Sequence, residues 1–264
     1  MSLSGTIEQH GKVCFYMNEC VENFVSFVCP TNDCSIYEKW LHPSLKEQIN
    51  QNFEIILIDT KNQRFASAAE ALNYGAGKAR GNVLVFCHHD VVLLSPRFVD
   101  DVIRLSNSET FGIAGVAGTE LSGKPQVYSS VTQGPDHAQA GIRIERVVEC
   151  GTLDERLFII KKSNFSQFDI LGNTWHFYAV DYSLKCHQSN QKVLLFPLPI
   201  YHVSPGYSLN GNYFDYVKVL AKKYPSLKTI RTTMGTFRNN AFLGVYLSLK
   251  KAKSVLFEKR FGHK

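Results

Sequence analysis

Short apolar runs alternate with longer amphipathic segments through the first half of the chain. The apolar runs predict buried strands over residues 23–29, 53–58, 82–87 and 111–117. Periodic apolar positions and a Ser-Pro start predict helices between them, over residues 37–45, 65–80 and 95–105. Strands that alternate with helices are typical of an α/β domain with right-handed crossovers. We therefore predict a mostly parallel central sheet that is flanked by helices.

The pattern changes after Gly118, where apolar segments follow one another without helices between them. These segments predict strands over residues 126–130, 142–150 and 157–162. A helix is then predicted to open near Trp175, followed by a strand over residues 192–196. We find no internal repeat and no low-complexity linker. The chain is therefore predicted to form one domain over residues 1–217 and a basic helical extension over residues 218–264.

The positive charge is concentrated in this extension. The formal net charge of the chain is +6, yet residues 218–264 carry twelve Lys and Arg against a single acid, Glu258. Apolar residues recur there at helical spacing, namely Phe242, Val245, Tyr246, Leu249, Leu256 and Phe257. Two interpretations remain open: a helix that covers the sheet, or a basic amphipathic helix that contacts an anionic membrane. No nucleic-acid recognition motif accompanies the charge, so nucleic acid is not an expected partner.

Length and cysteine content narrow the class of protein. A chain of 264 residues with 44% hydrophobic residues can bury the core of one large α/β domain. No apolar stretch reaches 18 residues, and the N-terminus lacks the regions of a signal peptide. Seven cysteines without a Cys-x-x-Cys pair predict free thiols in a reducing compartment. The expected location is therefore the cytoplasm.

Polar residues follow directly on the apolar run at 82–87. They are His88, His89 and Asp90. In open α/β sheets, ligands bind outside the carboxyl ends of the strands. An imidazole nitrogen and a carboxylate at such a place can hold a divalent ion and, through it, a phosphate group.

The stretch over residues 73–90 also carries a motif. It contains, at fixed spacing, Asn73, Gly75, Ala79, Gly81, Phe86 and Asp90. This spacing resembles the Asn-x-Gly-x-x-x-Ala-x-Gly, strand and Asp-x-Asp pattern of family 2 glycosyltransferases, which have the GT-A fold. His88 replaces the first aspartate, and the chain is similar to a branch in which Leu-Asp-x-x-Leu-Phe-Ile-Ile follows, here residues 153–160. The resemblance covers residues 23–206.

The resemblance implies a metal site and a donor site at the strand ends. Asp90 and His202, together with His88, are implied to hold Mn²⁺ or Mg²⁺. His202 lies on a proline-bounded loop after the predicted strand at 192–196. The donor is implied to be a nucleotide-diphosphate sugar, with UDP as the first choice. Its implied contacts are Thr31, Asp59, Asn73, His88 and Asp90.

The resemblance also implies an acceptor side. Asp181 precedes Leu184 by three residues, and this segment is similar to the family's short Asp-x-x-Leu segment. Asp181 is therefore implied to take the proton of the acceptor hydroxyl. The alternative is an ordinary acid in the first turn of a helix. The implied acceptor contacts are Gly118, Thr119, Trp175 and His176, although glycine and tryptophan also serve close packing.

The resemblance, together with these residues, implies a metal-dependent, inverting glycosyltransferase. Its acceptor is expected to be a saccharide, a lipid-linked molecule or a protein. One alternative is a protein that binds nucleotides or sugars on the same fold without catalysis. A second is a sugar nucleotidyltransferase, but residues 30–33 lack the Gly-rich phosphate loop that it needs after the first strand.

Overall fold

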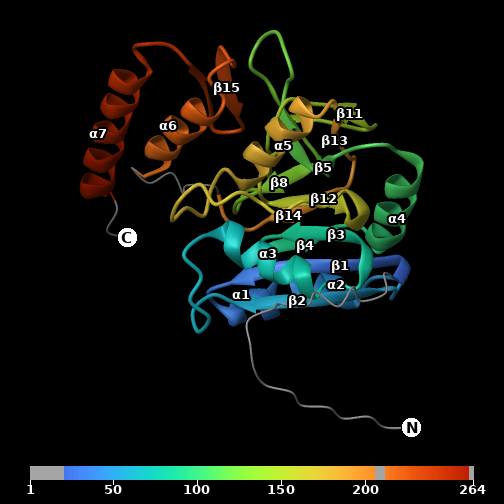
Figure 1. Cartoon of the computed structure of the whole chain (residues 1–264). Coiled ribbons are helices and arrows are strands. Elements are labelled where there is room, and N and C mark those ends of the chain that lie inside the picture. The colour runs from blue at the N-terminus through green and yellow to red at the C-terminus, as the bar shows by residue number, and fades with distance from the viewer. Residues whose placement is uncertain (1–20, 206–211, 262–264) are drawn as a thin grey trace, which may run out of the picture.

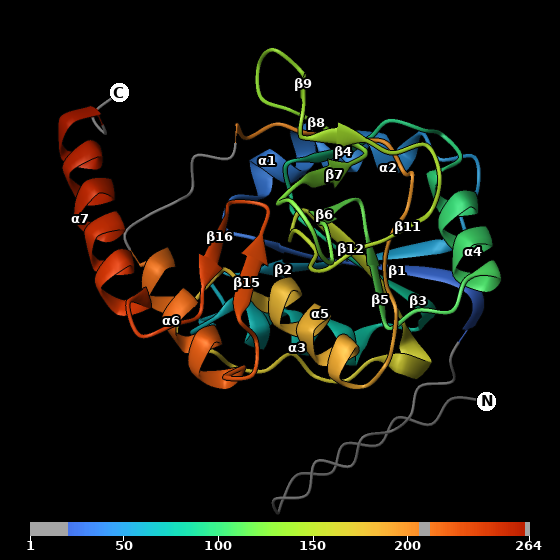
Figure 2. The same cartoon turned by 90° about the horizontal axis from the view of Figure 1, so that it is seen from above.

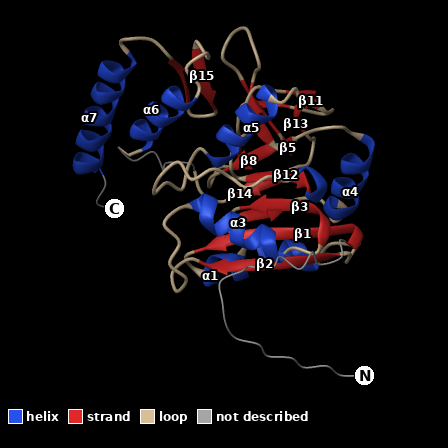
Figure 3. Ribbon diagram, in the orientation of Figure 1, coloured by secondary structure: helices blue, strands red, loops and turns tan. Residues whose placement is uncertain are grey.

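A twisted sheet runs through the centre of the computed structural model, which describes residues 21–205 and 212–261, with side chains as far as residue 254 (Figure 3). Within these residues the sheet has seven strands in the order β11-β13-β5-β12-β3-β1-β2. Their bounds are β1 (Val21–Thr31), β2 (Phe53–Asp59), β3 (Gly81–Cys87), β5 (Ile113–Gly115), β11 (Val148–Glu149), β12 (Leu157–Lys161) and β13 (Val193–Leu195). Strands β2, β1, β3, β5 and β13 run in one direction, and β12 and β11 run in the other. The predicted mostly parallel α/β sheet is confirmed.

Helices cover both faces of this sheet (Figure 1). One face carries α1 (Cys34–Lys39), α2 (Leu41–Lys46) and α4 (Phe98–Ser108), and the other carries α3 (Ala68–Lys78) and α5 (Tyr178–Gln188). Side chains alternate across a strand. In β3, Val83, Val85 and Cys87 join the first core, whereas Leu84 and Phe86 join the second. Because both faces of β3 are buried, its sequence contains no charged residue.

Two glycines of the motif over residues 73–90 serve close packing. A Cβ atom on Gly75 of α3 would lie 2.5 Å from Val28 Cγ1 and 2.7 Å from Ile58 Cδ1. A Cβ atom on Gly81 would lie 2.3 Å from the carbonyl oxygen of Phe24. Only a residue without a side chain lets α3 and the start of β3 come this close to β1 and β2.

Smaller sheets extend one side of the domain. Within the described residues, one has the order β10-β7-β6 and another has the order β4-β14-β8-β9. Their strands are β4 (Val91–Leu93), β6 (Ala117–Thr119), β7 (Val127–Ser129), β8 (Val131–Gln133), β9 (Ala138–Gln139), β10 (Ile142–Arg143) and β14 (Ile200–His202). A 3-10 turn, η1 (Lys162–Asn164), follows β12. The pairing of β14 with β4 brings two distant segments to one edge of the domain.

The C-terminal part forms a unit with its own core, which we call the C-terminal unit. It consists of α6 (Tyr213–Lys223), β15 (Thr229–Thr232), β16 (Gly235–Arg238) and α7 (Leu243–Phe261). Figure 2 shows this unit beside α5. The boundary predicted at residue 218 falls inside α6, and the segment contains a β-hairpin as well as helices. None of the helices in the described part is long and apolar enough to span a membrane.

The described part of the predicted apolar stripe does not face the sheet. On α7, Leu243 and Leu247 are buried against the C-terminal unit. Four other apolar residues, just before and within α7, are exposed, namely Phe242, Val245, Tyr246 and Leu249. Leu256 and Phe257 lie beyond the described side chains. The stripe therefore leaves an apolar helix face uncovered by the described residues.

Candidate active site

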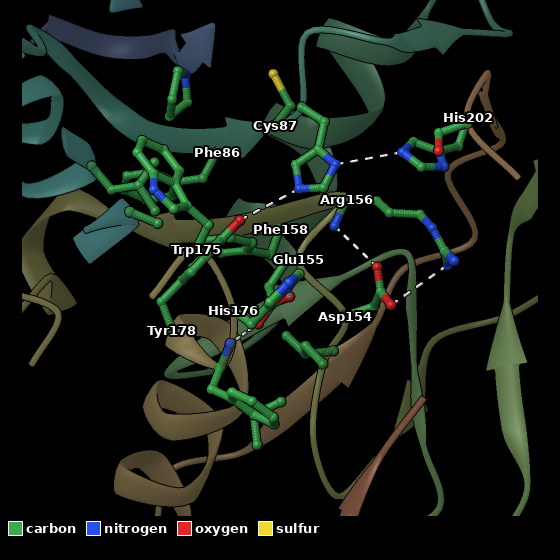
Figure 4. A pocket seen from close by; sticks show the side chains of 18 of the residues that line it. Phe86, Cys87, Asp154, Glu155, Arg156, Phe158, Trp175, His176, Tyr178 and His202 are labelled. Carbon is green, nitrogen blue, oxygen red and sulfur yellow. Dashed lines mark hydrogen bonds and ion pairs between the residues drawn. The ribbon is translucent and has the colours of Figure 1, made fainter. Parts of the chain in front are cut away.

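A cavity of about 630 Å³ opens at the carboxyl ends of β1, β2 and β3. Pro30, Asn32 and Thr60 line it near β1 and β2, and residues 88–90 line it after β3. Its position is the one expected for a ligand site in an open α/β sheet. Figure 4 shows the side chains that converge there.

Three side chains with metal-binding atoms meet at one wall of the cavity. Asp90 Oδ1 lies 3.3 Å from His202 Nε2 and 4.0 Å from His88 Nδ1. The same two ring nitrogens lie 3.4 Å apart. One ligand atom from each residue lies within 4.8 Å of the others. The structure thus brings together His88, Asp90 and His202, which are far apart in sequence.

Strand pairing explains how His202 reaches this cluster. His202 ends β14 and pairs with Val91, the first residue of β4. The amide of Val203 donates a hydrogen bond of 3.0 Å to the carbonyl oxygen of Asp90. Asp90 Oδ2 accepts a further bond of 3.2 Å from the amide of Ser204. The carboxylate is therefore fixed by backbone on one oxygen, and its other oxygen faces the imidazoles.

The electrostatics of the cluster favour the forms that bind cations. Burial opposes the charge on Asp90, but the hydrogen bond and charge of His202 and the charges of His88 and His89 hold its pKa well below the ordinary value. Burial, together with the nearby charge of His202, lowers the pKa of His88 to about 4. An ionised carboxylate and a neutral imidazole at neutral pH are the protonation states that metal ligation requires.

The residues present fit a divalent cation. Two imidazoles and one carboxylate form a mixed nitrogen and oxygen set, and three protein ligands leave further positions for oxygens of a substrate. Because imidazole suits transition metals better than Mg²⁺, the two histidines distinguish this set from an all-oxygen site.

A charged triplet without a predicted role also lines the cavity: Asp154, Glu155 and Arg156. It precedes β12, which runs antiparallel to β3, and Leu157 pairs with Cys87. The start of β12 therefore lies beside the end of β3. Three consecutive charged residues before the apolar run at 157–160 were the available signal, but the strand direction is needed to place them.

Asp154 and Arg156 form a buried ion pair next to the histidine cluster. Arg156 Nη1 lies 3.5 Å from Asp154 Oδ2, which also accepts a hydrogen bond of 2.6 Å from the hydroxyl of Thr233. Burial opposes the charge on Asp154, but Arg156 and Thr233 lower its pKa below the ordinary value. Arg156 thus places a fixed positive charge in the cavity wall.

Glu155 and His176 form a second pair at the cavity. His176 Nδ1 lies 3.8 Å from Glu155 Oε2, and the other carboxylate oxygen accepts a hydrogen bond from the amide of Phe177. Phe177 directly precedes α5 and has a positive φ of 73°. Its hydrogen bond to Glu155 therefore fixes the backbone at the start of that helix. Trp175 also lines the cavity and is 43% exposed. The structure thus places the predicted residues Trp175 and His176 in the cavity wall.

The C-terminal unit completes the wall. Its contributions are Tyr213 from α6 and, from the hairpin of β15 and β16, Thr232, Thr233 and Met234. Thr233 binds Asp154, and Arg231 donates a hydrogen bond of 3.3 Å to the carbonyl oxygen of Glu120. The extension is therefore part of the site, which no pattern in the sequence indicates.

Three predicted donor contacts lie outside the cavity lining. Thr31 Oγ1 lies 2.6 Å from Nδ1 of His89, a lining residue. Asp59 accepts hydrogen bonds from the amides of Lys61 and Asn62 and so holds a turn. The side chain of Asn73 bonds both backbone groups of Phe168. In this structure Thr31 supports a lining residue, whereas Asp59 and Asn73 hold backbone.

Two predicted acceptor contacts, Gly118 and Thr119, also lie outside the cavity lining and are buried. A Cβ atom on Gly118 would lie 2.5 Å from the carbonyl oxygen of Thr152, so this glycine permits backbone packing. Thr119 is 3% exposed, and its hydroxyl lies 3.1 Å from that of Thr152. Neither residue lines the cavity.

Asp181, the predicted proton acceptor, lies outside the cavity lining. Its side chain is 2% exposed and does not line the cavity, although its neighbour Val180 does. Lys223 Nζ lies 2.6 and 2.7 Å from its two carboxylate oxygens, and the hydroxyl of Tyr224 donates a bond of 2.8 Å. One residue along a helix turns the side chain by about 100°. Asp181 consequently faces α6 and ties α5 to the C-terminal unit.

Comparisons with known proteins agree with this fold. A family model described as "Glycosyltransferase like family" matches residues 26–203. The crystal structure of S. aureus TarS 1-349 is similar, with a TM-score of 0.50 and 14% identity. That match covers 76% of this chain and 65% of the TarS chain, and at this identity it concerns the GT-A fold alone. No curated protein matches the chain. Since the family model spans well over half of the sequence, the chain belongs to the glycosyltransferase like family.

Proposed function

We propose that this protein is an inverting glycosyltransferase that uses a nucleotide-diphosphate sugar and a divalent metal. The observation that carries the proposal is the convergence of His88, Asp90 and His202 at the carboxyl end of β3, inside the cavity. A metal at these residues would neutralise the charge that develops on the leaving diphosphate. Family membership supports a glycosyl donor and a carbohydrate-containing acceptor.

The chain's own residues supply the remaining functions. Arg156 adds a buried positive charge beside the metal ligands, where it can bind a phosphate oxygen. Pro30, Asn32 and Thr60, at the ends of the two neighbouring strands, would contact the nucleoside. Trp175 offers an exposed ring on which a sugar can stack. The acceptor hydroxyl would attack the anomeric carbon opposite the diphosphate, which inverts the configuration.

Donor binding and turnover test the proposal together. We expect UDP, or failing it GDP or dTDP, to raise the melting temperature more with Mn²⁺ than with Mg²⁺, because two of the ligands are imidazoles. Release of the nucleotide from a panel of donor sugars should then depend on Mn²⁺. Binding without turnover for every donor and acceptor would favour the non-catalytic alternative. If none of the nucleotides binds with any divalent metal, the proposal is wrong.

We also propose that the exposed face of α7 contacts an anionic membrane surface, which would suit a lipid-linked acceptor. Phe242, Val245 and Leu249 are 76%, 63% and 67% exposed. Exposed basic residues flank this face, namely Arg238, Lys250 and Lys253. Apolar side chains beside basic ones match an interface with acidic headgroups. Free cysteines are consistent with the reducing, cytoplasmic side of such a membrane. The described cysteines that are free are Cys29, Cys34, Cys87, Cys150 and Cys186, and Cys14 and Cys20 lie outside the described residues.

Vesicle sedimentation checks this contact. The protein should bind vesicles that contain phosphatidylglycerol, bind phosphatidylcholine vesicles less, and detach as salt is raised, because salt screens the lysines. The variant V245S/L249S should lose binding, whereas I49S, at a residue that is 65% exposed and far along the chain, should retain it. Dimerisation that V245S/L249S abolishes, without vesicle binding, would show that a second copy covers this face instead.

A further inference from the structure

The proposed transfer needs a group that takes a proton, and two of the three carboxylates in the described lining, Asp90 and Asp154, are already engaged. Asp90 is surrounded by imidazoles and a backbone amide. Asp154 is paired with Arg156 and Thr233, and its pKa is lowered, which makes it a weak base. Asp181 faces α6. Among the carboxylates of the described lining, this leaves Glu155, which faces His176.

The geometry of this pair is that of an imidazole oriented by a carboxylate. His176 Nδ1 faces Glu155 Oε2 at 3.8 Å, and the Glu155 carboxylate is itself fixed by the amide of Phe177. No hydrogen-bond partner for the second ring nitrogen, Nε2, occurs in the part of the chain that the structure describes. Figure 4 shows the pair side by side, away from His202. An oriented imidazole with one available nitrogen is the arrangement of a general base.

We infer that His176 is the catalytic base of the proposed transfer and that Glu155 is its positioning residue; this inference rests on the proposed function. In the step, the acceptor oxygen bonds to the anomeric carbon while the bond from that carbon to the β-phosphate oxygen breaks. The bonding electrons leave with the nucleotide diphosphate. The hydroxyl proton moves to His176 Nε2, and the Glu155 carboxylate stabilises the imidazolium that results.

Titratable groups around His176 determine in which direction its pKa is shifted, and so how the transfer rate depends on pH. Those that face it are Glu155 and Asp154, from the segment before β12, and Tyr213 of α6, whose ring centroid lies 5.8 Å away. Burial lowers the pKa of His176, but the nearby negative charge of Glu155 outweighs it, so the pKa is raised. Burial also raises the pKa of Glu155. Transfer should therefore rise as the pH rises through the pKa of His176, since the neutral ring is the base.

The test compares two variants at the pair with two at a matched pair on the surface. H176Q should lower the turnover number by about 100-fold or more while nucleotide binding persists, because proton transfer is lost and the donor site is intact. E155Q keeps an oxygen for the Phe177 amide but removes the charge, so the acid limb of the pH–rate profile should move to lower pH. The controls are H42Q and E38Q, since His42 Nδ1 lies 2.5 Å from Glu38 on the outside of the protein. They should leave the rate and the profile unchanged.

A second measurement separates this inference from the proposed function. NMR titration of the His176 ring, assigned by its absence in H176Q, should show a lower pKa in E155Q than in the wild type. An unchanged pKa in E155Q, or wild-type turnover in H176Q, would overturn the inference even if the protein transfers sugar. Absence of turnover with every donor would overturn the base role together with the proposed function. The NMR titration would still show whether Glu155 raises the pKa of His176.

Discussion

Asp181→Asn should lower the free energy of unfolding by about 2 kcal/mol and leave nucleotide binding by the folded protein intact. The carboxylate is buried and accepts two short contacts from Lys223 and a hydrogen bond from Tyr224. Removing its charge leaves the Lys223 ammonium, which is 28% exposed, without its buried partner. The cost is moderate because Lys223 also pairs with Asp169 at 2.6 Å. Urea denaturation followed by circular dichroism measures the change.

Asp169 provides the matched control for this experiment. It binds the same lysine, but its side chain is 45% exposed. Asp169→Asn should therefore cost less than about 1 kcal/mol, as exposed ion pairs do. If Asp181→Asn keeps full stability but abolishes turnover, Asp181 acts in catalysis as the sequence motif implied, and the ion pair with Lys223 is incidental.

Asp90→Asn should weaken the Mn²⁺-dependent binding of the nucleotide by about 100-fold or more, since it removes a proposed metal ligand rather than an outer partner. An amide is a poorer ligand than a carboxylate and carries no charge. Its NH₂ group, moreover, would point toward imidazole nitrogens now 3.3 and 4.0 Å from the carboxylate oxygen. Calorimetric titration of UDP at fixed Mn²⁺ measures the loss, and turnover should fall with it.

Asp59→Asn is the matched control, because Asp59 also ends a strand of the central sheet but does not line the cavity. It should change nucleotide affinity little. Equal losses in Asp59→Asn and Asp90→Asn would mean that the nucleotide lies along the edge of β2, as the resemblance implied, rather than at the histidine cluster. Unchanged Mn²⁺ dependence in Asp90→Asn would contradict the metal site.

The central fold could be predicted because its strands are buried on both faces and therefore uncharged. The strands predicted at 23–29, 53–58 and 82–87 lie within β1, β2 and β3 as observed. Less regular parts escaped prediction. The helix predicted over 37–45 is interrupted at Trp40, where α1 ends and α2 begins. The strand predicted over 111–117 is divided at Val116 between β5 and β6, which belong to different sheets.

The candidate site was predictable only in part. His88 and Asp90 follow an apolar strand, so their place at its end could be read from the sequence, and the family motif added His202. Asp154, Glu155 and Arg156 reach the cavity only because β12 runs against β3, and no sequence pattern states the direction of a strand. Asp181 illustrates the converse. A motif gives spacing along the chain, whereas the face of the helix on which a side chain lies is decided by what packs against it.

Helix α5 belongs to two cores at once. Ala179, Tyr182 and Cys186 pack toward the central sheet, while Val180 and Leu184, with Phe177 just before the helix, pack toward the C-terminal unit. A fragment that stopped at residue 203, where the family match ends, would uncover the second set of side chains and lose Lys223, the counter-ion of Asp181. The boundary of the recognisable family is thus not a boundary at which this polypeptide can be cut. The family match ends at residue 203, whereas the core that α5 shares with the C-terminal unit continues beyond it.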